Sequence, residues 1–210
     1  LLNEEIDTNI SNNNWLTISK IFNSNIELFT SSKHNVVLAG DSHAATLSYD
    51  LKKKLEVSTK GFLTSVFEGC QFILNTNRVN KKTYKIYKNC SEATQNERFE
   101  FINKYNSSIV ILFGRLTNIL EEERFSNSEL GAEGGIMKDF IQNSSNSLKT
   151  KKDRKKYIFD NYKYTVDKLI ENGHKVILVY SMPEVGISVP NKIFQIAPAK
   201  ISMLKSFLKK

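Results

Sequence analysis

The sequence predicts an α/β fold in which helices cover both faces of a central parallel sheet. Short apolar runs, each suited to a fully buried strand, recur along the chain, and segments with apolar residues at intervals of three and four lie between them. Buried strands that alternate with amphipathic helices are typical of parallel sheets. At 210 residues the chain is long enough to bury one such core, so one domain is the simplest organisation.

Residues 1–34 are expected to precede this domain as a linker and a lead-in helix. Residues 1–13 are polar and rich in asparagine, without a clear period. Apolar residues then recur at helical spacing and predict an amphipathic helix, which is carried by Trp15, Ile18, Phe22, Ile26 and Phe29. The domain itself is expected to span residues 35–210.

Within the domain, apolar runs and helix signals alternate. Ser91 is placed as the N-cap of one helix, and Gly173 as the residue that stops another. The polar stretch over residues 118–150 is expected to be a long loop beside the functional site, with disorder as the alternative. The predicted elements are a strand at 36–39, a helix at 44–55, a strand at 62–67, a helix at 91–105, a strand at 109–113, a helix at 158–170 and a strand at 175–180.

Lysine gives the chain a formal net charge of +8, and one dense basic cluster comprises Lys149, Lys151, Lys152, Arg154, Lys155 and Lys156. The simplest interpretation is a solvated face, and contact with anionic lipid head groups is the alternative. No aromatic residues are interleaved with these cations and no nucleic-acid motif is present, so nucleic acid is not expected as a partner. No run approaches about 18 consecutive apolar residues, so no segment is predicted to span a membrane.

The two cysteines, Cys70 and Cys90, leave two possibilities open. They can form one intramolecular disulfide in an oxidising compartment, or remain two unrelated thiols in a reducing one. No third cysteine or histidine lies at a spacing typical of zinc, so no metal site is expected.

The most informative segment is Gly40-Asp41-Ser42-His43-Ala44, between a predicted buried strand and a predicted helix. Ser42 therefore falls on a strand-to-helix turn at the carboxyl edge of the sheet, where open α/β proteins bind their ligands. The first N–H groups of the helix are suited to stabilise a developing oxyanion. This arrangement favours a nucleophilic serine, and the alternative is a serine that only caps the helix.

The same five residues resemble the first sequence block of the SGNH hydrolases, in particular of the SGNH domains fused behind membrane-embedded acyltransferase-3 domains of bacteria. Three later features are similar to that branch: the cysteine pair, the strand end at 109–116, and Ser181–Gly186 with its proline. The resemblance covers roughly residues 35–192. It implies a three-layer SGNH-hydrolase (flavodoxin-like) fold with a central parallel sheet, and a Cys70–Cys90 disulfide in an oxidising periplasm.

The resemblance also implies roles for the site residues. Ser42 is the expected catalytic nucleophile, and its own N–H the first oxyanion donor. Further oxyanion or substrate-orienting candidates are Gly69, Gly114 and Arg115. Residues expected to support the turn are Gly40, Asp41 and His43. Leu116 stands where the branch carries tryptophan, which puts an aromatic sugar-stacking role at that position in doubt.

The base that should activate Ser42 is missing from its expected place. In the family an Asp-x-x-His motif near the carboxyl end supplies the base and its acidic partner, and this sequence contains none. His34 and His174 are expected to be structural, and His43 is expected to point away from the serine hydroxyl. We expect a fragment that stops before the final block and is a poor catalyst as it stands. The alternative is a non-catalytic relative.

The function that the resemblance implies is O-acyl transfer in the bacterial cell envelope, with O-acetylation of a surface polysaccharide as the expected case. A fused or associated membrane acyltransferase domain would deliver the acyl group, a carbohydrate would accept it, and no bound cofactor or metal would be needed. The expected location is the periplasm or the outer face of the cytoplasmic membrane. The alternatives are a carbohydrate or lipid esterase and a glycan-binding SGNH module without catalysis.

Overall fold

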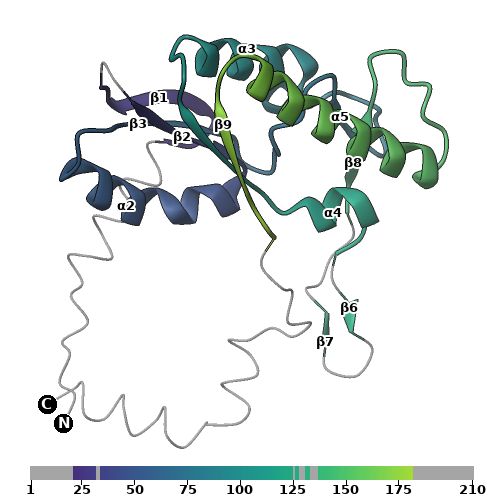
Figure 1. Ribbon diagram of the computed structural model, residues 1–210. Helices are drawn as coiled ribbons and strands as arrows, with labels where there is room; N and C mark the ends of the chain where they lie inside the picture. Colours follow the sequence, from purple (N-terminus) through teal and green to yellow (C-terminus); the bar gives the residue numbers. More distant parts are fainter. Residues whose placement is uncertain (1–20, 32–33, 125, 128–130, 133–136, 182–210) are drawn as a thin grey trace, which may run out of the picture.

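A five-stranded sheet, mostly parallel, forms the centre of the molecule (Figure 1). The computed structural model describes residues 21–31, 34–124, 126–127, 131–132 and 137–181. The strand order is β1-β3-β2-β5-β9, in which β2, β3, β5 and β9 run parallel and β1 runs antiparallel to β3. The strands are β1 (Ser24–Phe29), β2 (Asn35–Gly40), β3 (Gly61–Val66), β5 (Ile109–Phe113) and β9 (Lys175–Val179).

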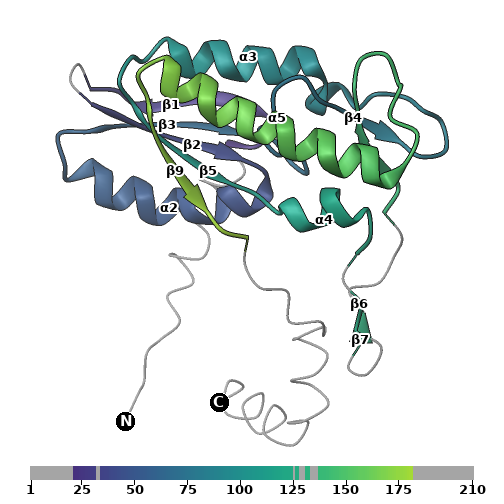
Figure 2. The same ribbon diagram turned by 45° about the vertical axis from the view of Figure 1, so that its right-hand side comes forward.

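Helices cover both faces of the sheet, as Figures 1 and 2 show. Helix α2 (Ser42–Glu56) packs on one face, while α3 (Glu92–Asn103) and α5 (Lys151–Glu171) pack on the other. Strand β2 lies at the centre and is buried along its whole length, with Val36 and Leu38 toward α2. The three layers confirm the predicted α/β class, and burial on both faces explains why the strand reads as a continuous apolar run.

The N-cap of α3 is Ser91, as expected, and its side chain accepts a hydrogen bond from the Thr94 N–H. The predicted lead-in helix is wrong over residues 24–29, which form β1. Residues 1–20 lie outside the described part of the chain. Most β1 side chains are half-buried at a sheet edge. Their apolar spacing also fits a helix, but backbone pairing with β3 makes the segment a strand.

The polar stretch over residues 118–150 is not a long structureless loop. Helix α4 (Leu116–Glu121) opens it, and Ile119 of α4 packs against Ile141 and Ile158. The few apolar residues within this polar stretch are enough to pack it against the rest of the domain. The strands beyond α4 are β6 (Ser126–Asn127), its partner β7 (Gly131–Ala132), and β8 (Asp139–Gln142), which pairs antiparallel with β4 (Asn77–Asn80).

A disulfide joins Cys70 and Cys90, whose Cα atoms lie 5.4 Å apart. It closes the segment that contains β4, and the short helix η1 (Lys88–Cys90) ends at the second cysteine. Phe67 and Tyr87 pack against the buried sulfur atoms. In the chain-entropy account, closure of a loop of this size stabilises the fold by about 3 kcal/mol.

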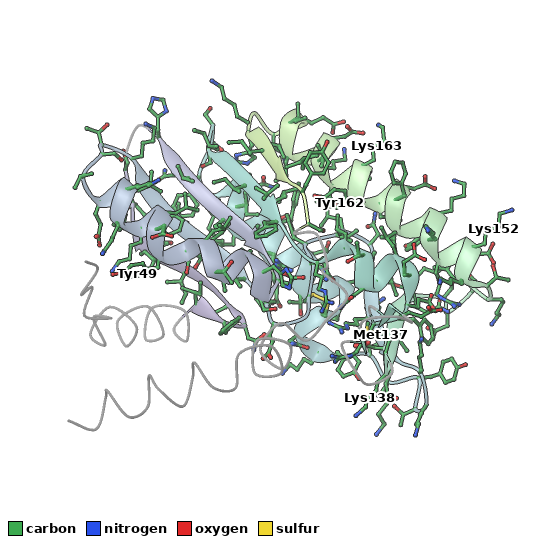
Figure 3. The ribbon with its side chains drawn as sticks, turned by 90° about the horizontal axis from the view of Figure 1, so that it is seen from below. Tyr49, Met137, Lys138, Lys152, Tyr162 and Lys163 are labelled. Atoms are coloured by element: carbon green, nitrogen blue, oxygen red, sulfur yellow. A yellow bond between two sulfur atoms is a disulfide. The ribbon has the colours of Figure 1, made fainter. Side chains whose placement is uncertain are left out.

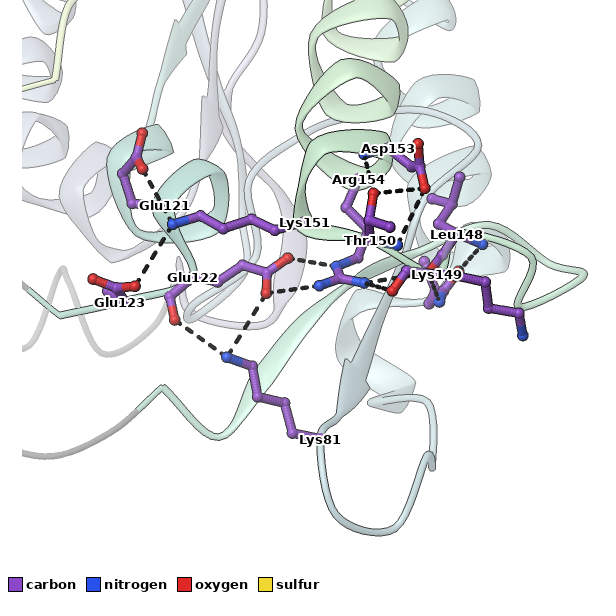
Figure 4. A network of polar contacts seen from close by, with 11 residues as sticks. Lys81, Glu121, Glu122, Glu123, Leu148, Lys149, Thr150, Lys151, Asp153 and Arg154 are labelled. Carbon is purple, nitrogen blue, oxygen red and sulfur yellow. Dashed lines mark hydrogen bonds and ion pairs between the residues drawn. The ribbon is translucent and has the colours of Figure 1, made fainter.

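The basic cluster at the start of α5 is largely paired with acids. Arg154 binds the buried carboxylate of Glu122, with Nη2 3.0 Å from Oε2, and Lys81 approaches the same residue (Figure 4). Lys151 Nζ lies 3.3 Å from Glu121 Oε2. The cluster members paired with carboxylates are Lys151, Arg154, Lys155 and Lys156. Exposed pairs add little stability, but they neutralise the cluster, so a solvated face is the fitting interpretation.

Acidification is expected to destabilise the fold through His174. His174 is 4% exposed, and its Nε2 lies 3.1 Å from Asn103 Oδ1. Burial lowers the pKa of His174 below its usual value of 6.5. The unfolded chain therefore binds the proton more readily, so this stabilisation is complete above the unfolded pKa and is lost as the pH falls through the folded pKa.

Urea unfolding of the wild-type chain should therefore shift to lower urea between about pH 7 and about pH 5. A His174→Gln variant should show less of this shift, and His34→Gln, at an exposed histidine, serves as the control. The same pH dependence in the wild type and His174→Gln would show that another group is responsible.

Candidate active site

Ser42 lies on the turn between β2 and α2, at the carboxyl edge of the parallel strands. The N-cap of α2 is Asp41, because its side chain accepts a hydrogen bond from the His43 N–H at 2.9 Å. Ser42 is half-buried, and its hydroxyl has no hydrogen-bond partner among the described residues. The N-cap role that the sequence left open for Ser42 is therefore taken by Asp41.

Gly40 permits the closest backbone approach at this turn. A Cβ atom at this position would lie 1.7 Å from the carbonyl oxygen of Phe113 and 2.9 Å from Cβ of Ala44. No L side chain fits that space, because real contacts of this kind do not fall below 3.0 Å. The glycine therefore brings the carboxyl ends of β2 and β5 together directly before Ser42.

The Asp41 carboxylate joins three loops at the carboxyl edge of the sheet. Its Oδ1 caps α2, while its Oδ2 accepts hydrogen bonds from Gln71 Nε2 and from the Arg115 N–H, each at 2.8 Å. Gln71 Nε2 also donates to the Arg115 carbonyl oxygen at 3.0 Å. A Cβ on Gly114 would lie 3.1 Å from Gln71 Cγ and 3.3 Å from Asp41 Oδ2, so this network leaves little room beside the strand end. The turn before Ser42 is thereby fixed to the loops after β3 and β5.

Arg115 takes part in this network through its backbone N–H and carbonyl oxygen. Because its N–H donates to Asp41, that group cannot also bind an oxyanion in this conformation. Ser181, after β9, closes the same edge: its hydroxyl donates to the Gly114 carbonyl oxygen at 2.9 Å. The Ser42 N–H, in contrast, belongs to the first turn of α2, whose N–H groups have no partner within the helix.

Gly69 lies in the turn after β3, closed by a hydrogen bond from the Cys70 N–H to the Phe67 carbonyl oxygen at 2.9 Å. Its φ of +63° lies in the left-handed region that favours glycine. A Cβ there would lie 2.4 Å from Nη1 of Arg78, whose guanidinium also pairs with Asp139. The structure thus gives Gly69 a packing role beside Arg78, and no hydrogen bond joins it to Ser42.

Arg98 contacts the backbone directly before the Ser42 turn, a role that the sequence did not predict. It is fully buried in α3, with Nη2 3.0 Å from the Gly40 carbonyl oxygen and 2.9 Å from that of Ser65. Its guanidinium lies 4.8 Å from the ring centres of both Phe67 and Phe72. Burial lowers the pKa of Arg98 to about 9, and the negative charge of Asp41 opposes that shift, so the group remains charged at neutral pH.

A family model described as the SGNH domain fused to AT3 domains matches residues 18–205. The chain belongs to this family. Among solved structures, the SGNH domain is similar to the periplasmic domain of a lipopolysaccharide acetyltransferase from Salmonella ser. Paratyphi A. That match has 15% sequence identity and a TM-score of 0.44, and it covers 83% of this chain and 58% of the other. No curated protein matches the chain.

None of the three histidines of this SGNH domain pairs with Ser42. His34 precedes β2 and His174 precedes β9, which places both at the amino edge of the parallel strands, opposite the serine. The His43 ring packs edge-on against Phe113, with 6.2 Å between ring centres, and its buried Nδ1 has no hydrogen-bond partner in the described part of the chain.

A small cavity lies next to the Asp41 network, between the ends of β2 and β5 and helix α5. Gln71, Gly114 and Leu116 line it, and Tyr162 of α5 closes its far side. Figure 3 labels Tyr162 on α5, and burial raises the pKa of its hydroxyl. Leu116 thus gives this cavity an aliphatic wall.

The described residues of the SGNH domain hold neither a candidate metal cluster nor a membrane-spanning helix. They contain no group of three or more histidine, cysteine, aspartate or glutamate side chains placed to hold a metal ion. None of the helices in these segments is long and apolar enough to cross a membrane.

Proposed function

We propose that this SGNH domain transfers an acyl group, acetyl in the simplest case, to a hydroxyl of a cell-envelope polysaccharide. The observation that carries the proposal is the Ser42 hydroxyl, which lies half-buried at the N-terminus of α2 with no partner among the described residues, while Asp41 performs the capping. A serine in this position has a hydroxyl free to react and helix N–H groups beside it.

The reaction would proceed in two steps through Ser42. Its Oγ attacks the acyl carbonyl carbon and gives its proton to a base, and the Ser42 N–H stabilises the oxyanion of the tetrahedral intermediate. The base gives this proton to the donor's leaving group as the intermediate collapses, which forms a serine ester and leaves the base free again. A sugar hydroxyl, deprotonated by the same base, then attacks that ester and frees the serine. Water in place of the sugar would make the site an esterase.

The donor and the location follow from the family. Since its members are fused to AT3 domains, we propose that a membrane acyltransferase domain delivers the acyl group and that this domain works on the periplasmic side of the membrane. The disulfide between Cys70 and Cys90 supports an oxidising compartment. The chemistry calls for no bound cofactor.

The proposal needs a base within hydrogen-bond reach of Ser42, and no histidine of this chain meets that need in the structure. An SGNH module that binds glycan without catalysis would show the same turn and need no base. The experiment must therefore separate transfer, hydrolysis and binding.

Cells that express the full gene should attach acyl groups to their surface polysaccharide, and cells without the gene should not. Mass spectrometry of the purified polysaccharide measures the transfer, and release of free acid measures hydrolysis. Ester on the polysaccharide supports transfer. Free acid without polysaccharide ester would identify an esterase, and neither product with retained glycan binding would identify the binding module.

A further inference from the structure

A loop rich in lysine and free of acidic residues lies between β4 and Cys90. We define the 81–88 loop by its sequence Lys-Lys-Thr-Tyr-Lys-Ile-Tyr-Lys; no aspartate or glutamate occurs from residue 69 to residue 91. Exposed lysines of the loop, which no carboxylate in the described ranges contacts, are Lys82, Lys85 and Lys88. Lys138, also exposed, lies beside the loop, since its carbonyl oxygen accepts a hydrogen bond from the Lys81 N–H at 2.7 Å (Figure 3).

Two large apolar side chains stand among these lysines. Tyr84 is 62% exposed and Ile86 is 47% exposed. The Tyr84 ring packs edge-on against Phe140, with ring centres 6.0 Å apart, so one side is anchored and the rest faces solvent. Tyr84 also has a φ of +55°, in the left-handed region that bulky side chains seldom adopt.

The loop is held in one conformation by its own hydrogen bonds. The Tyr84 N–H donates to the Asn80 carbonyl oxygen and the Asn80 N–H to that of Lys85, each at 2.9 Å. Asn80 Oδ1 accepts from the N–H groups of Lys82 and Thr83. The disulfide fixes the end of the segment. A surface held in this way loses little conformational entropy when it binds a partner.

We propose that the 81–88 loop binds anionic phospholipid at a membrane surface. The lysine ammonium groups would lie on lipid phosphates, and Tyr84 and Ile86 would enter the zone between head groups and acyl chains, where aromatic rings and basic side chains with apolar stems are favoured. The loop has no carboxylate, and the amide oxygen of Asn80 already accepts from Lys82 and Thr83, so few of its side chains are left to accept hydrogen bonds from sugar hydroxyls. An exposed isoleucine among cations therefore fits lipid better than a sugar chain.

The inference rests on the proposed function in one respect only, because a domain fused to a membrane partner works beside lipid. It does not use Ser42, so vesicle binding and acyl transfer can fail independently.

Vesicles of phosphatidylglycerol and phosphatidylcholine in equal parts should sediment with the chain, and vesicles of phosphatidylcholine alone should not. Each lysine near an anionic surface contributes about fivefold in affinity, so the triple change of Lys82, Lys85 and Lys88 to glutamine should weaken binding about a hundredfold. The matched control changes three other exposed lysines to glutamine: Lys54, Lys104 and Lys175. It removes the same charge from the opposite, amino edge of the sheet. It should weaken binding about twofold or less.

Three results would overturn the proposal. Failure of the wild-type chain to bind the anionic vesicles would do so directly. Equal weakening in both triple variants would show that binding depends on net charge and not on this loop. Retention of soluble polygalacturonate by the wild type, with loss in the loop variant and no vesicle binding, would make an anionic glycan the ligand. Circular dichroism should show the same fold in all three proteins, because the changed residues are exposed.

A double variant tests the apolar part of the surface. Tyr84→Ser with Ile86→Ser should weaken the fraction of vesicle binding that persists at high salt, since salt screens only the lysine contribution. Unchanged binding at high salt in this variant would contradict insertion of the two side chains.

Discussion

Replacement of Ser42 by alanine is expected to lower polysaccharide acylation at least about a thousandfold, because removal of a catalytic nucleophile leaves only the rate supported by binding and the oxyanion site. The fold should remain, since the Ser42 hydroxyl has no hydrogen-bond partner among the described residues and Asp41 caps the helix. We expect the free energy of unfolding to change by less than about 0.5 kcal/mol. Acyl groups per polysaccharide repeat, measured in cells that express the full gene, check the first expectation.

The matched control is Ser48→Ala in the same helix. Ser48 is fully buried and its hydroxyl donates to the Ala45 carbonyl oxygen at 2.6 Å, so this variant should lose some stability and keep its acylation. The opposite pattern, full acylation in Ser42→Ala, would exclude the serine ester and with it the proposed mechanism. Capture of an acyl group on the Ser42 peptide by mass spectrometry would establish the intermediate directly.

The parallel strands and their helices could be predicted because burial on both faces leaves a strong pattern. Strand β5 agrees with the predicted residues 109–113, and the predicted N-cap Ser91 opens α3. Strand β1 could not be predicted in the same way. It is a six-residue edge strand with half-buried side chains, and its apolar residues also satisfy a helical spacing, so only the pairing with β3 distinguishes the two.

The candidate site was predictable where it lies within one segment. The strand, glycine and helix around Ser42 are consecutive, so their spacing alone places the serine. Gln71 and Arg98 were missed because their roles depend on partners 30 and 58 residues away. For Gln71, the available signal was its position directly before an apolar run. For Arg98, the signal was a row of polar residues on one face of α3, made by Thr94, Gln95 and Arg98.

Surface charge shows why sequence clusters do not identify binding surfaces. The dense cluster around Lys151 lies beside acids of α4 in space, although these acids are about 30 residues distant in the chain. The looser spacing of lysines in the 81–88 loop attracts less notice in the sequence. Lys81 of this loop lies near Glu122, but Lys82, Lys85 and Lys88 are exposed and no acid occurs within the disulfide-closed segment.

Arg98→Met should be the most destabilising single change in the region around the turn, at about 3–5 kcal/mol. The guanidinium donates to the carbonyl oxygens of Gly40 and Ser65, and Nη1 donates to that of Cys70 at 3.2 Å. Methionine fills much of the space between the two phenylalanine rings but donates nothing. Each of those oxygens would then lose a donor in a buried place, and the buried Asp41 carboxylate would lose the attraction of a buried positive charge.

Urea unfolding measures this loss as a lower midpoint at an unchanged slope. The control is Glu97→Met, which places the same side chain at an exposed position of α3 and should cost less than about 0.5 kcal/mol. Arg98→Lys keeps the charge, but an ammonium group cannot reach the ends of β2, β3 and the disulfide loop together, so it should restore only part of the stability. Equal midpoints for Arg98→Met and Glu97→Met would mean that the turn before Ser42 is held by Asp41 and Gln71 alone. A large loss would instead show that the buried arginine fixes the backbone from which the reactive hydroxyl projects.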